Sequence, residues 1–460
     1  LDAYPWLWLC VFLLGEARNK SFMNTKYLQT LVLLAGMTIG FACLAYDVHR
    51  NDAHMVIGAF AFLFLGYFFL VKQKALFNWK TWIWIGLGLR LIFIASGPAL
   101  SDDFYRFIWD GRVLIEGENP YLVLPHDYLE SREDAFAKKL ERDLYHGLNS
   151  KHYYTIYPPV NQCCFAIAAF LGDGNVKAEL FYLRLIILVG EGALLFLLAR
   201  ILSILQRPRE DLVWYALNPL VIVELSGNLH FEGMVLLFLA AALLYFIRGK
   251  WGASGVLFAL AVGTKLLPLM LLPALIPILK QRTAAYFGVV LAGLGLLFLP
   301  FMSQALFANW GSSLDLYFQK FEFNASIYYL VRWVGSLFLG YHPPIAVIGP
   351  ILSLLSLLII LLIALKSKFN FFQKTVLIYS VYLLLTTTVH PWYLVSLVFF
   401  TSLTKWRFAA LWSFLAVLSY SHYANGGFKE NYLLIGLEYG ALALFIGFTF
   451  FASRSKIKTT

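Results

Sequence analysis

Long apolar stretches alternate with short polar segments along most of the chain. A helix that crosses a membrane needs about 20 apolar residues, with a range of about 17–25, and several stretches are shorter than that. The sequence therefore predicts an all-α polytopic membrane protein with about 13–15 transmembrane helices, some of them broken or tilted, in particular at prolines. The predicted spans are 27–46, 54–71, 81–98, 180–204, 211–225, 233–247, 251–264, 266–279, 284–301, 344–365, 374–390, 391–404, 407–422 and 431–451, with a doubtful one at 3–14.

Composition supports one integral membrane domain over residues 1–460. The chain is 60% hydrophobic and 17% aromatic, and only 13% of its residues are charged, against about 25% in an ordinary soluble domain. A soluble protein of this length would have too few polar residues to cover its surface. The net charge of +10 lies in short clusters between apolar stretches, so no nucleic-acid partner is expected.

The basic residues predict an orientation. More than half of the 36 Lys and Arg fall in one alternating set of loops, which the positive-inside rule places in the cytoplasm. The basic loops alternate with the other loops only if the apolar stretch 159–171 does not cross the membrane. This stretch is therefore predicted to be a re-entrant or interfacial helix. The opposite, outer face then carries 101–158, 226–232, 302–342, His390 and 422–430.

The large extracytoplasmic loop 101–158 is predicted to be folded. Apolar residues recur with helical spacing at 104–108, just after Ser101, and at 136–144, after Ser131. Serine is a favoured N-cap, so two short amphipathic juxtamembrane helices are expected on the membrane surface.

Two adjacent acids, Asp102 and Asp103, are the sharpest chemical feature. They could simply complement the positive N-terminus of a helix. Alternatively, one carboxylate beside another at an apolar boundary has a raised pKa and serves as a general base. Asp110 and Arg112, about two turns further on, are expected to form a local ion pair.

Among the charged residues inside predicted spans, the functional candidates are Arg90, Arg184, Glu191 and Glu224. Charges in apolar spans are costly and mark functional or paired positions. Arg184 and Glu191 share a helix face and could belong to one internal network. Structural pairing and a chemical role both remain open for all four.

Further polar residues map to the outer face. Lys265 could snorkel to the interface or bind an anion, and Arg332 is flanked by aromatic residues. His390 could be a hydrogen-bonded interface residue, while His230 and Glu232 could form a polar turn or orient a bound group. No cysteine accompanies the histidines, so no metal site is predicted. No cofactor is expected, although a divalent metal stays open.

Acid–base groups and cations thus gather at one face, on separate segments. This pattern favours a membrane enzyme acting on an anionic lipid substrate. A channel would scatter polar residues along its spans, and a transporter would show paired broken helices in two halves, which the sequence lacks.

At these residues the chain resembles a known group. The segments SDDFYRFIWDGR (101–112), EGENPY (116–121) and YPP (157–159) are similar to the first outer loop of GT-C-fold glycosyltransferases, above all of bacterial polyprenol-phosphate-mannose-dependent mannosyltransferases. The first mannosyltransferase of GPI-anchor assembly is more distantly similar. Short motifs continue the likeness in the same order: YALNP (215–219), NLHFE (228–232), TK (264–265) before Pro268, and HPWY (390–393).

The resemblance implies a GT-C fold, a lipid-phosphate-sugar donor and a catalytic base in the first outer loop. That base would be Asp103 or Asp102. The two acids are adjacent here, whereas relatives have an Asp-x-Asp form, so the choice between them stays open, with a lean towards Asp103. The residues expected to bind substrate are Tyr105, Arg106, Asp110, Arg112, Tyr157, His230, Glu232, Lys265, Asn324, Arg332, His390 and Trp392.

The sequence therefore predicts an inverting glycosyltransferase. It would move a sugar, with mannose expected, from a polyprenyl-phosphate donor to a lipid or glycan acceptor on the outer membrane face. Lys265, Arg332 and His390 are expected to stabilise the leaving phosphate. A transporter or flippase of lipid-linked sugars and a glycan polymer ligase are the alternatives. The expected location is the bacterial inner membrane; the basic tail 456–458 keeps the ER membrane as an alternative.

Overall fold

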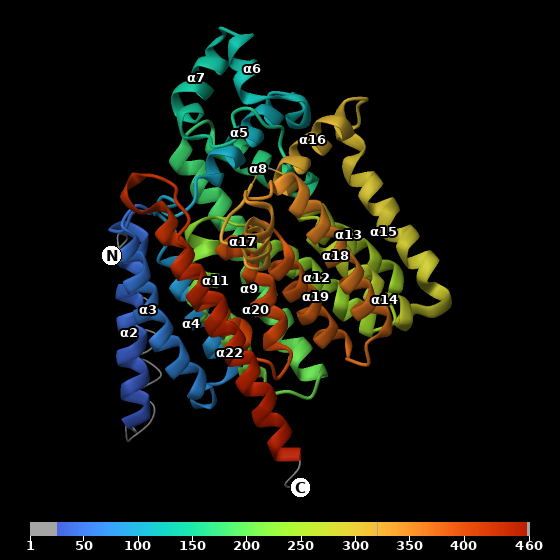
Figure 1. Cartoon of the computed structure of the whole chain (residues 1–460). Coiled ribbons are helices and arrows are strands. Elements are labelled where there is room, and N and C mark those ends of the chain that lie inside the picture. Colours follow the sequence, from blue (N-terminus) through green and yellow to red (C-terminus); the bar gives the residue numbers. More distant parts are fainter. Residues whose placement is uncertain (1–24, 320, 458–460) are drawn as a thin grey trace.

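Helices build the described part of the chain, which comprises residues 25–319 and 321–457 of the computed structural model (Figure 1). The doubtful span 3–14 and the end of the basic tail lie outside the described residues. The helices are α2 (Thr25–Tyr46), α3 (Ala53–Lys72), α4 (Trp79–Leu91), α5 (Asp103–Ile115), α6 (Pro125–Glu130), α7 (Ala135–Asp143), α8 (Pro159–Gly172), α9 (Val176–Ile204), α10 (Val213–Ala216), α11 (Pro219–Ile222), α12 (Glu232–Ile247), α13 (Trp251–Thr264), α14 (Leu272–Leu279), α15 (Thr283–Phe298), α16 (Leu306–Gln319), α17 (Ile327–Leu339), α18 (Ile345–Lys366), α19 (Phe371–Leu385), α20 (Leu394–Ser402), α21 (Phe408–Leu415) and α22 (Tyr432–Ile457).

The all-α polytopic membrane class is confirmed. Among the described residues, six helical stretches are long and apolar enough to cross a membrane, and seven if the bent pair Pro219–Gly227 and Glu232–Ile247 counts as one span. Other apolar helices have only 10–17 residues, so the expected count of 13–15 exceeds what the long helices supply. The predicted span 211–225, for example, is broken because Asn218 caps a new helix and Pro219 cannot donate a backbone hydrogen bond.

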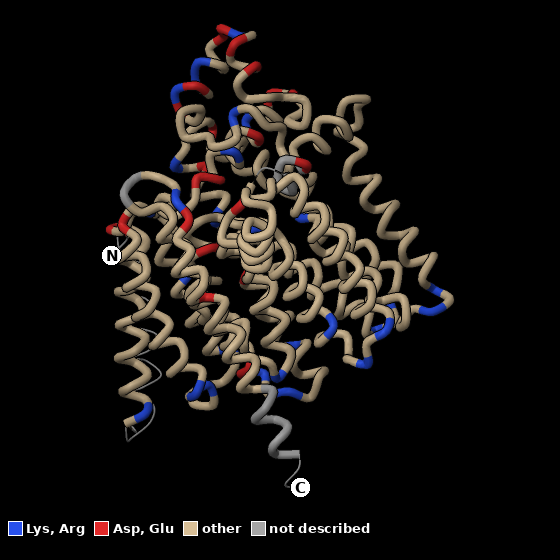
Figure 2. Tube along the Cα trace, viewed as in Figure 1, with Lys and Arg blue, Asp and Glu red and all other residues tan. Residues whose placement is uncertain are grey.

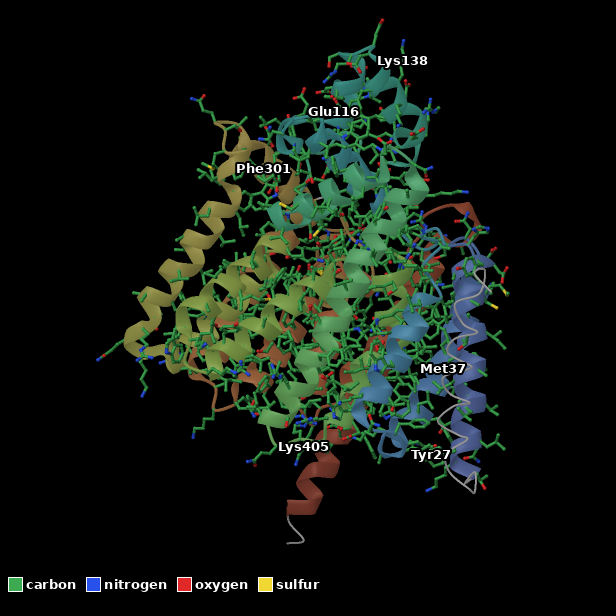
Figure 3. All side chains as sticks on the ribbon, turned by 180° about the vertical axis from the view of Figure 1, so that it is seen from behind. Tyr27, Met37, Glu116, Lys138, Phe301 and Lys405 are labelled. Carbon is green, nitrogen blue, oxygen red and sulfur yellow. The ribbon has the colours of Figure 1, made fainter. Side chains whose placement is uncertain are left out.

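The two ends of the bundle differ in charge. Figure 2 shows lysines and arginines at the end of the bundle near the C-terminus, whereas 101–158, with both signs of charge, covers the opposite end. Figure 3 places Lys138 and Glu116 at that covered end and Tyr27 and Lys405 at the other. The basic loops grouped by the sequence therefore do lie together.

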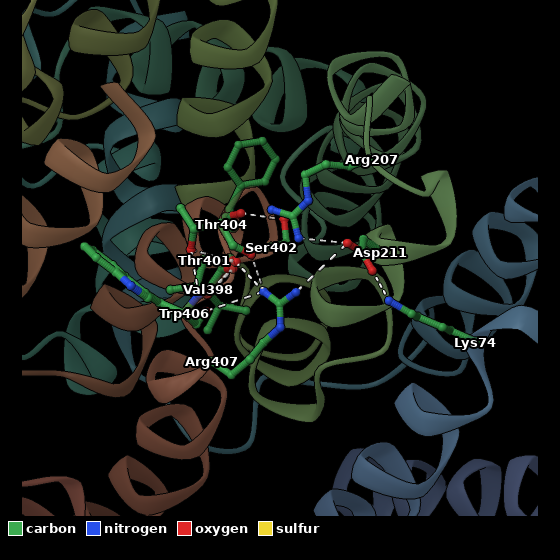
Figure 4. Close-up of polar contacts among 10 residues, drawn as sticks. Lys74, Arg207, Asp211, Val398, Thr401, Ser402, Thr404, Trp406 and Arg407 are labelled. Carbon is green, nitrogen blue, oxygen red and sulfur yellow. Dashed lines mark hydrogen bonds and ion pairs between the residues drawn. The ribbon is translucent and has the colours of Figure 1, made fainter. Parts of the chain in front are cut away.

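At the basic end, the buried carboxylate of Asp211 contacts basic side chains from three different segments that connect helices (Figure 4). The side chain of Asp211 is 5% exposed and accepts a hydrogen bond from Arg207 at 2.8 Å. It also pairs with Lys74 and lies 4.0 Å from Arg407. Arg407 donates to the Thr401 carbonyl at 2.7 Å, so these cations hold the helix ends together.

Charged residues inside the spans are satisfied internally. Arg90 and Glu191 form a fully buried ion pair at 2.9 Å, and the Tyr215 hydroxyl donates to the same carboxylate. Arg184 instead donates to the Ser226 carbonyl at 2.6 Å. The expected shared network of Arg184 and Glu191 is therefore replaced by two separate sets of contacts.

The loop 101–158 is folded as predicted, with different caps. Helix α5 begins at Asp103, whose N–H donates to Ser101 Oγ at 3.3 Å. Helix α7 is capped by Asp134, which accepts from Ala137 N–H, whereas Ser131 Oγ donates to a carbonyl of the preceding turn. Because most of α5 is buried, it does not lie on the membrane surface as expected.

Helices α5 and α8 pack closely, which fixes the start of the loop. A helix at 159–171 is confirmed as α8, and its re-entrant or interfacial placement stays a prediction. A Cβ at Gly111 would lie 2.3 Å from the Phe165 carbonyl oxygen, so only glycine fits at this contact. This approach anchors α5, and with it the acids at its N-terminus, to the helix bundle.

Sequence reasoning missed two helices, α16 and α17, inside the segment 302–342, which it treated as a loop. Between them, Phe323 forms an isolated parallel bridge with Thr388. The Phe323 N–H donates to the Thr387 carbonyl at 3.1 Å, and the Val389 N–H donates to the Phe323 carbonyl at 2.8 Å. Because of this bridge, the segment before α17 lies beside the residues that precede His390.

Candidate active site

The two adjacent acids at the start of α5 have different surroundings. Asp102 forms an ion pair with Arg50 at 2.6 Å and is 38% exposed, and the Arg50 guanidinium stacks on the Tyr423 ring. Asp103 is 23% exposed and its Oδ2 lies 3.7 Å from His230 Nε2. Asp102 is thus held by a cation from the α2–α3 connection, while Asp103 faces the other predicted site residues.

His230 lies in residues 228–231, the tip that connects the two helices of the bent pair, Pro219–Gly227 and Glu232–Ile247. They meet at 110°, and Leu229 adopts a left-handed conformation with φ of 65°, which is uncommon for a branched residue. The tip is held because Leu100 N–H donates to Asn228 Oδ1 at 3.2 Å. Ser101 Oγ lies 3.4 Å from His230 Nε2, so the segment before α5 and the tip are joined.

The charges of Asp103 and His230 support each other. Burial lowers the pKa of His230, but its contacts with Asp103 and Glu224 outweigh burial and raise the pKa to about 9. Burial is the largest single influence on Asp103 and raises its pKa, but the contacts around the carboxylate, those with His230 first, together outweigh burial and hold the pKa below its ordinary value. The raised pKa expected for one of the two acids is therefore not found at Asp103. At neutral pH the site therefore contains an imidazolium beside a carboxylate.

Trp392 is stacked between two histidines. Its ring centroid lies 3.9 Å from that of His230 and 4.3 Å from that of His390, and Phe323 packs on the far side of His390. Burial lowers the pKa of His390 to about 3, so the expectation that His390 supplies a positive charge is wrong. Its Nδ1 is buried and has no hydrogen-bond partner among the described residues.

Lys265 lies at the end of the site nearest to α13. It directly follows α13 with an extended backbone, and its ammonium pairs with Glu232. The same ammonium lies 4.5 Å from the Tyr393 ring centroid. Because Glu232 and Tyr393 neighbour His230 and Trp392 in the chain, this cation is tied to the same two segments that carry the histidine–tryptophan stack.

Asn324 and Arg332 are engaged elsewhere. Asn324 is buried and donates to Glu438 Oε2 at 3.0 Å, while its N–H donates to Glu430. Arg332 makes two contacts with Glu322, at 2.7 and 2.8 Å. The structure places Asn324 next to Phe323 at the edge of the site, whereas the described contacts of Arg332 do not link it to the histidine–tryptophan stack.

The predicted residues in 104–157 support the loop through internal contacts. Arg106 forms a buried ion pair with Asp110 at 2.7 Å, and Arg112 contacts both carboxylate oxygens of Glu179 at 2.8 Å. The expectation that Asp110 and Arg112 pair with each other is therefore wrong. The Tyr157 ring packs edge-on against its aromatic neighbours. Whether these residues also contact substrate stays a prediction, as it does for Tyr105, whose ring packs against Gly147.

Several residues of the site were not predicted. Glu224 was recognised as a charge in a span but was not assigned to the site, although it lies six positions before His230 and contacts it. Arg50, Asn149 and Tyr420 gave no signal in the sequence, because only the fold brings them to Asp102, Asp103 and Glu224, respectively. Within the part of the chain that the structure describes, no three His, Cys, Asp or Glu side chains are grouped as a metal ion would require.

A carboxylate with a lowered pKa lies beside a protonated histidine, and a lysine lies close by, all at one end of an apolar helix bundle. This arrangement is suited to group transfer with an anionic leaving group, and it favours a membrane transferase as the general class of the protein.

Comparison with known proteins identifies the family. A family model described as "Alpha-(1->6)-mannopyranosyltransferase, N-terminal domain" matches residues 20–281, more than half of the chain, and the chain belongs to this family of mannosyltransferases. It is also similar to alpha-(1->6)-mannopyranosyltransferase A of Mycobacterium tuberculosis, with 25% identity over 217 residues. That match covers 42% of this chain and 39% of the relative. No solved structure matches the chain significantly.

Proposed function

We propose that the chain transfers mannose from a polyprenyl-phosphate donor to a hydroxyl of a lipid or glycan acceptor, with inversion at the sugar. The observation that supports this most is the position of Asp103, which faces the histidine–tryptophan stack and is free of the Arg50 ion pair that holds Asp102. A nucleotide-sugar donor is disfavoured, because the described residues include no α/β domain of the kind that binds nucleotides.

In the proposed step Asp103 is the general base. It takes the proton of the acceptor hydroxyl as that oxygen attacks the anomeric carbon. The bond from the anomeric carbon to the phosphate oxygen breaks at the same time, and its electron pair leaves with the polyprenyl phosphate. The leaving group gains negative charge, which a nearby cation stabilises.

We assign the stabilising charge to Lys265 and His230. Both are cations tied to the tip 228–231 and to the segment of Trp392. Neutral His390, whose Nδ1 has no hydrogen-bond partner among the residues that the structure describes, is suited to hydrogen bonding with a sugar hydroxyl. The described contacts of Arg332 go to Glu322 and do not link it to the histidine–tryptophan stack, so it has a smaller part in this proposal than the sequence predicts.

The relative's name gives the linkage alpha-(1->6), and we propose the same linkage here. An inverting reaction that forms an α-linkage requires the donor sugar to be β-linked to phosphate. The active site would lie on the extracytoplasmic face of a bacterial inner membrane, because the basic loops lie together at the opposite end of the bundle.

The test is to incubate the purified protein with radiolabelled β-mannosyl polyprenyl phosphate and a synthetic alkyl α-mannoside. The expected result is a labelled dimannoside together with free polyprenyl phosphate in equal amount. Donor that crosses the bilayer unchanged would instead indicate a flippase. Transfer of a preassembled glycan from a diphosphate lipid would indicate a ligase.

A further inference from the structure

Glu224 is a fully buried carboxylate behind the proposed active site. It lies in a single π-helical turn, Val223–Gly227, a rare irregularity that is frequent at functional sites. Its Oε2 accepts from Asn228 Nδ2 at 3.0 Å and lies 3.1 Å from His230 Nδ1. Tyr420 donates its hydroxyl to the other oxygen. The carboxylate is thus held by three groups and has no exposed surface of its own.

His230 connects Glu224 to the proposed base. One ring nitrogen faces Glu224, and the other lies 3.7 Å from Asp103 and 3.4 Å from Ser101. Stacking on Trp392 fixes the plane of the ring. In such an arrangement the partner of one nitrogen decides which proton the other nitrogen carries.

We propose that Glu224 is a positioning residue for sugar transfer: it holds His230 as an imidazolium whose Nε2–H points at Asp103, so that a positive charge stays beside the base and the leaving phosphate. This inference rests on the proposed function. It adds a buried acid to the proposed site, one that acts only through the histidine and does not touch substrate.

The other charged groups around His230 do not replace Glu224. Asp103 is the partner on the substrate side, and Glu232 is already paired with Lys265. The facing groups on the packed elements are Asp103, Glu224, Glu232, Lys265, His390 and Tyr420.

The proposal predicts a pH dependence. The pKa of His230 is raised to about 9, so the imidazolium is fully present at neutral pH and is lost as the pH rises through that value. Transfer that requires the imidazolium should therefore fall on a basic limb near pH 9. Without the Glu224 charge, the pKa of His230 should drop towards its ordinary value, and the limb should move down by about 1–2 pH units.

The experiment measures kcat for transfer from β-mannosyl polyprenyl phosphate between pH 5 and pH 10. E224Q should move the basic limb to lower pH. E224D, which keeps the charge, should leave the limb close to that of the native protein, as should Tyr420→Phe. A merely structural role of Glu224 would lower the rate at every pH without moving the limb, and that result would overturn the inference.

A second variant covers the case in which E224Q does not fold. H230Q has a neutral side chain in place of the imidazole, and its basic limb near pH 9 should disappear. If the limb persists in H230Q, His230 is not the group that titrates and the inference is wrong. Failure of the native protein to use the lipid donor would instead refute the proposed function, so the two failures are distinguishable.

Discussion

The adjacent acids Asp102 and Asp103 allow a matched pair of substitutions. Asp103→Asn keeps the size of the side chain and removes its capacity to take a proton. Loss of a general base typically costs about 10²–10⁴-fold in rate, or ~3–5 kcal/mol in activation free energy. Asp102→Asn breaks only the half-exposed pair with Arg50, and exposed pairs contribute about 0–1 kcal/mol to stability. Asp103→Asn should therefore lose turnover selectively, while Asp102→Asn should keep most of it.

The assay compares single-turnover rates and donor affinity for the two variants, after each has been shown to be folded by gel filtration and thermal unfolding. Asp103→Asn should bind the lipid donor with nearly native affinity and transfer sugar at least 100-fold more slowly. Normal turnover in Asp103→Asn would refute its role as the base. A rate loss in Asp102→Asn as large as that in Asp103→Asn would show that the different surroundings of the two acids do not decide their roles.

Three further predictions concern the phosphate, the loop and the topology. Lys265→Ala should slow transfer more than Lys265→Arg, because the leaving phosphate requires a cation; equal rates in both would place the phosphate elsewhere. Glu179→Gln should reduce the free energy of unfolding by about 3–5 kcal/mol, because it removes the main partner of buried Arg112, and an unchanged thermal midpoint in detergent would contradict this. In a variant without native cysteines, a cysteine at Glu141 should react with an impermeant thiol reagent added outside intact cells, whereas one at Lys250 should not; labelling of both would refute the orientation.

Much of the fold could be predicted because the membrane imposes a simple rule on the sequence. Apolar stretches such as 251–264 and 344–365 correspond closely to α13 and α18, since length and hydrophobicity decide those elements. The break at Asn218 and the helices inside 302–342 were harder to predict from the sequence, because capping and packing, rather than hydrophobicity, determine where such helices begin.

The candidate site shows the same division. Lys265, His230 and His390 could be assigned to one face by counting spans, and Trp392 was expected there from the family resemblance. The structure brings the four together. Their charge states could not be predicted, because a pKa depends on burial and on neighbours distant in sequence. His230 is protonated because Glu224 and Asp103 face it, whereas buried His390 is neutral.

In the proposed reaction a lipid-linked mannose is the donor and its anomeric configuration inverts. The most direct measurement offers the purified protein in liposomes an alkyl α-mannoside acceptor with one of three labelled donors: β-mannosyl polyprenyl phosphate, its α-anomer, or a nucleotide-linked mannose. We expect an α-(1->6)-linked product from the β-linked lipid alone, with release of polyprenyl phosphate. Transfer from the nucleotide-linked sugar, or a product whose anomeric configuration matches that of the lipid donor, would contradict the proposed reaction.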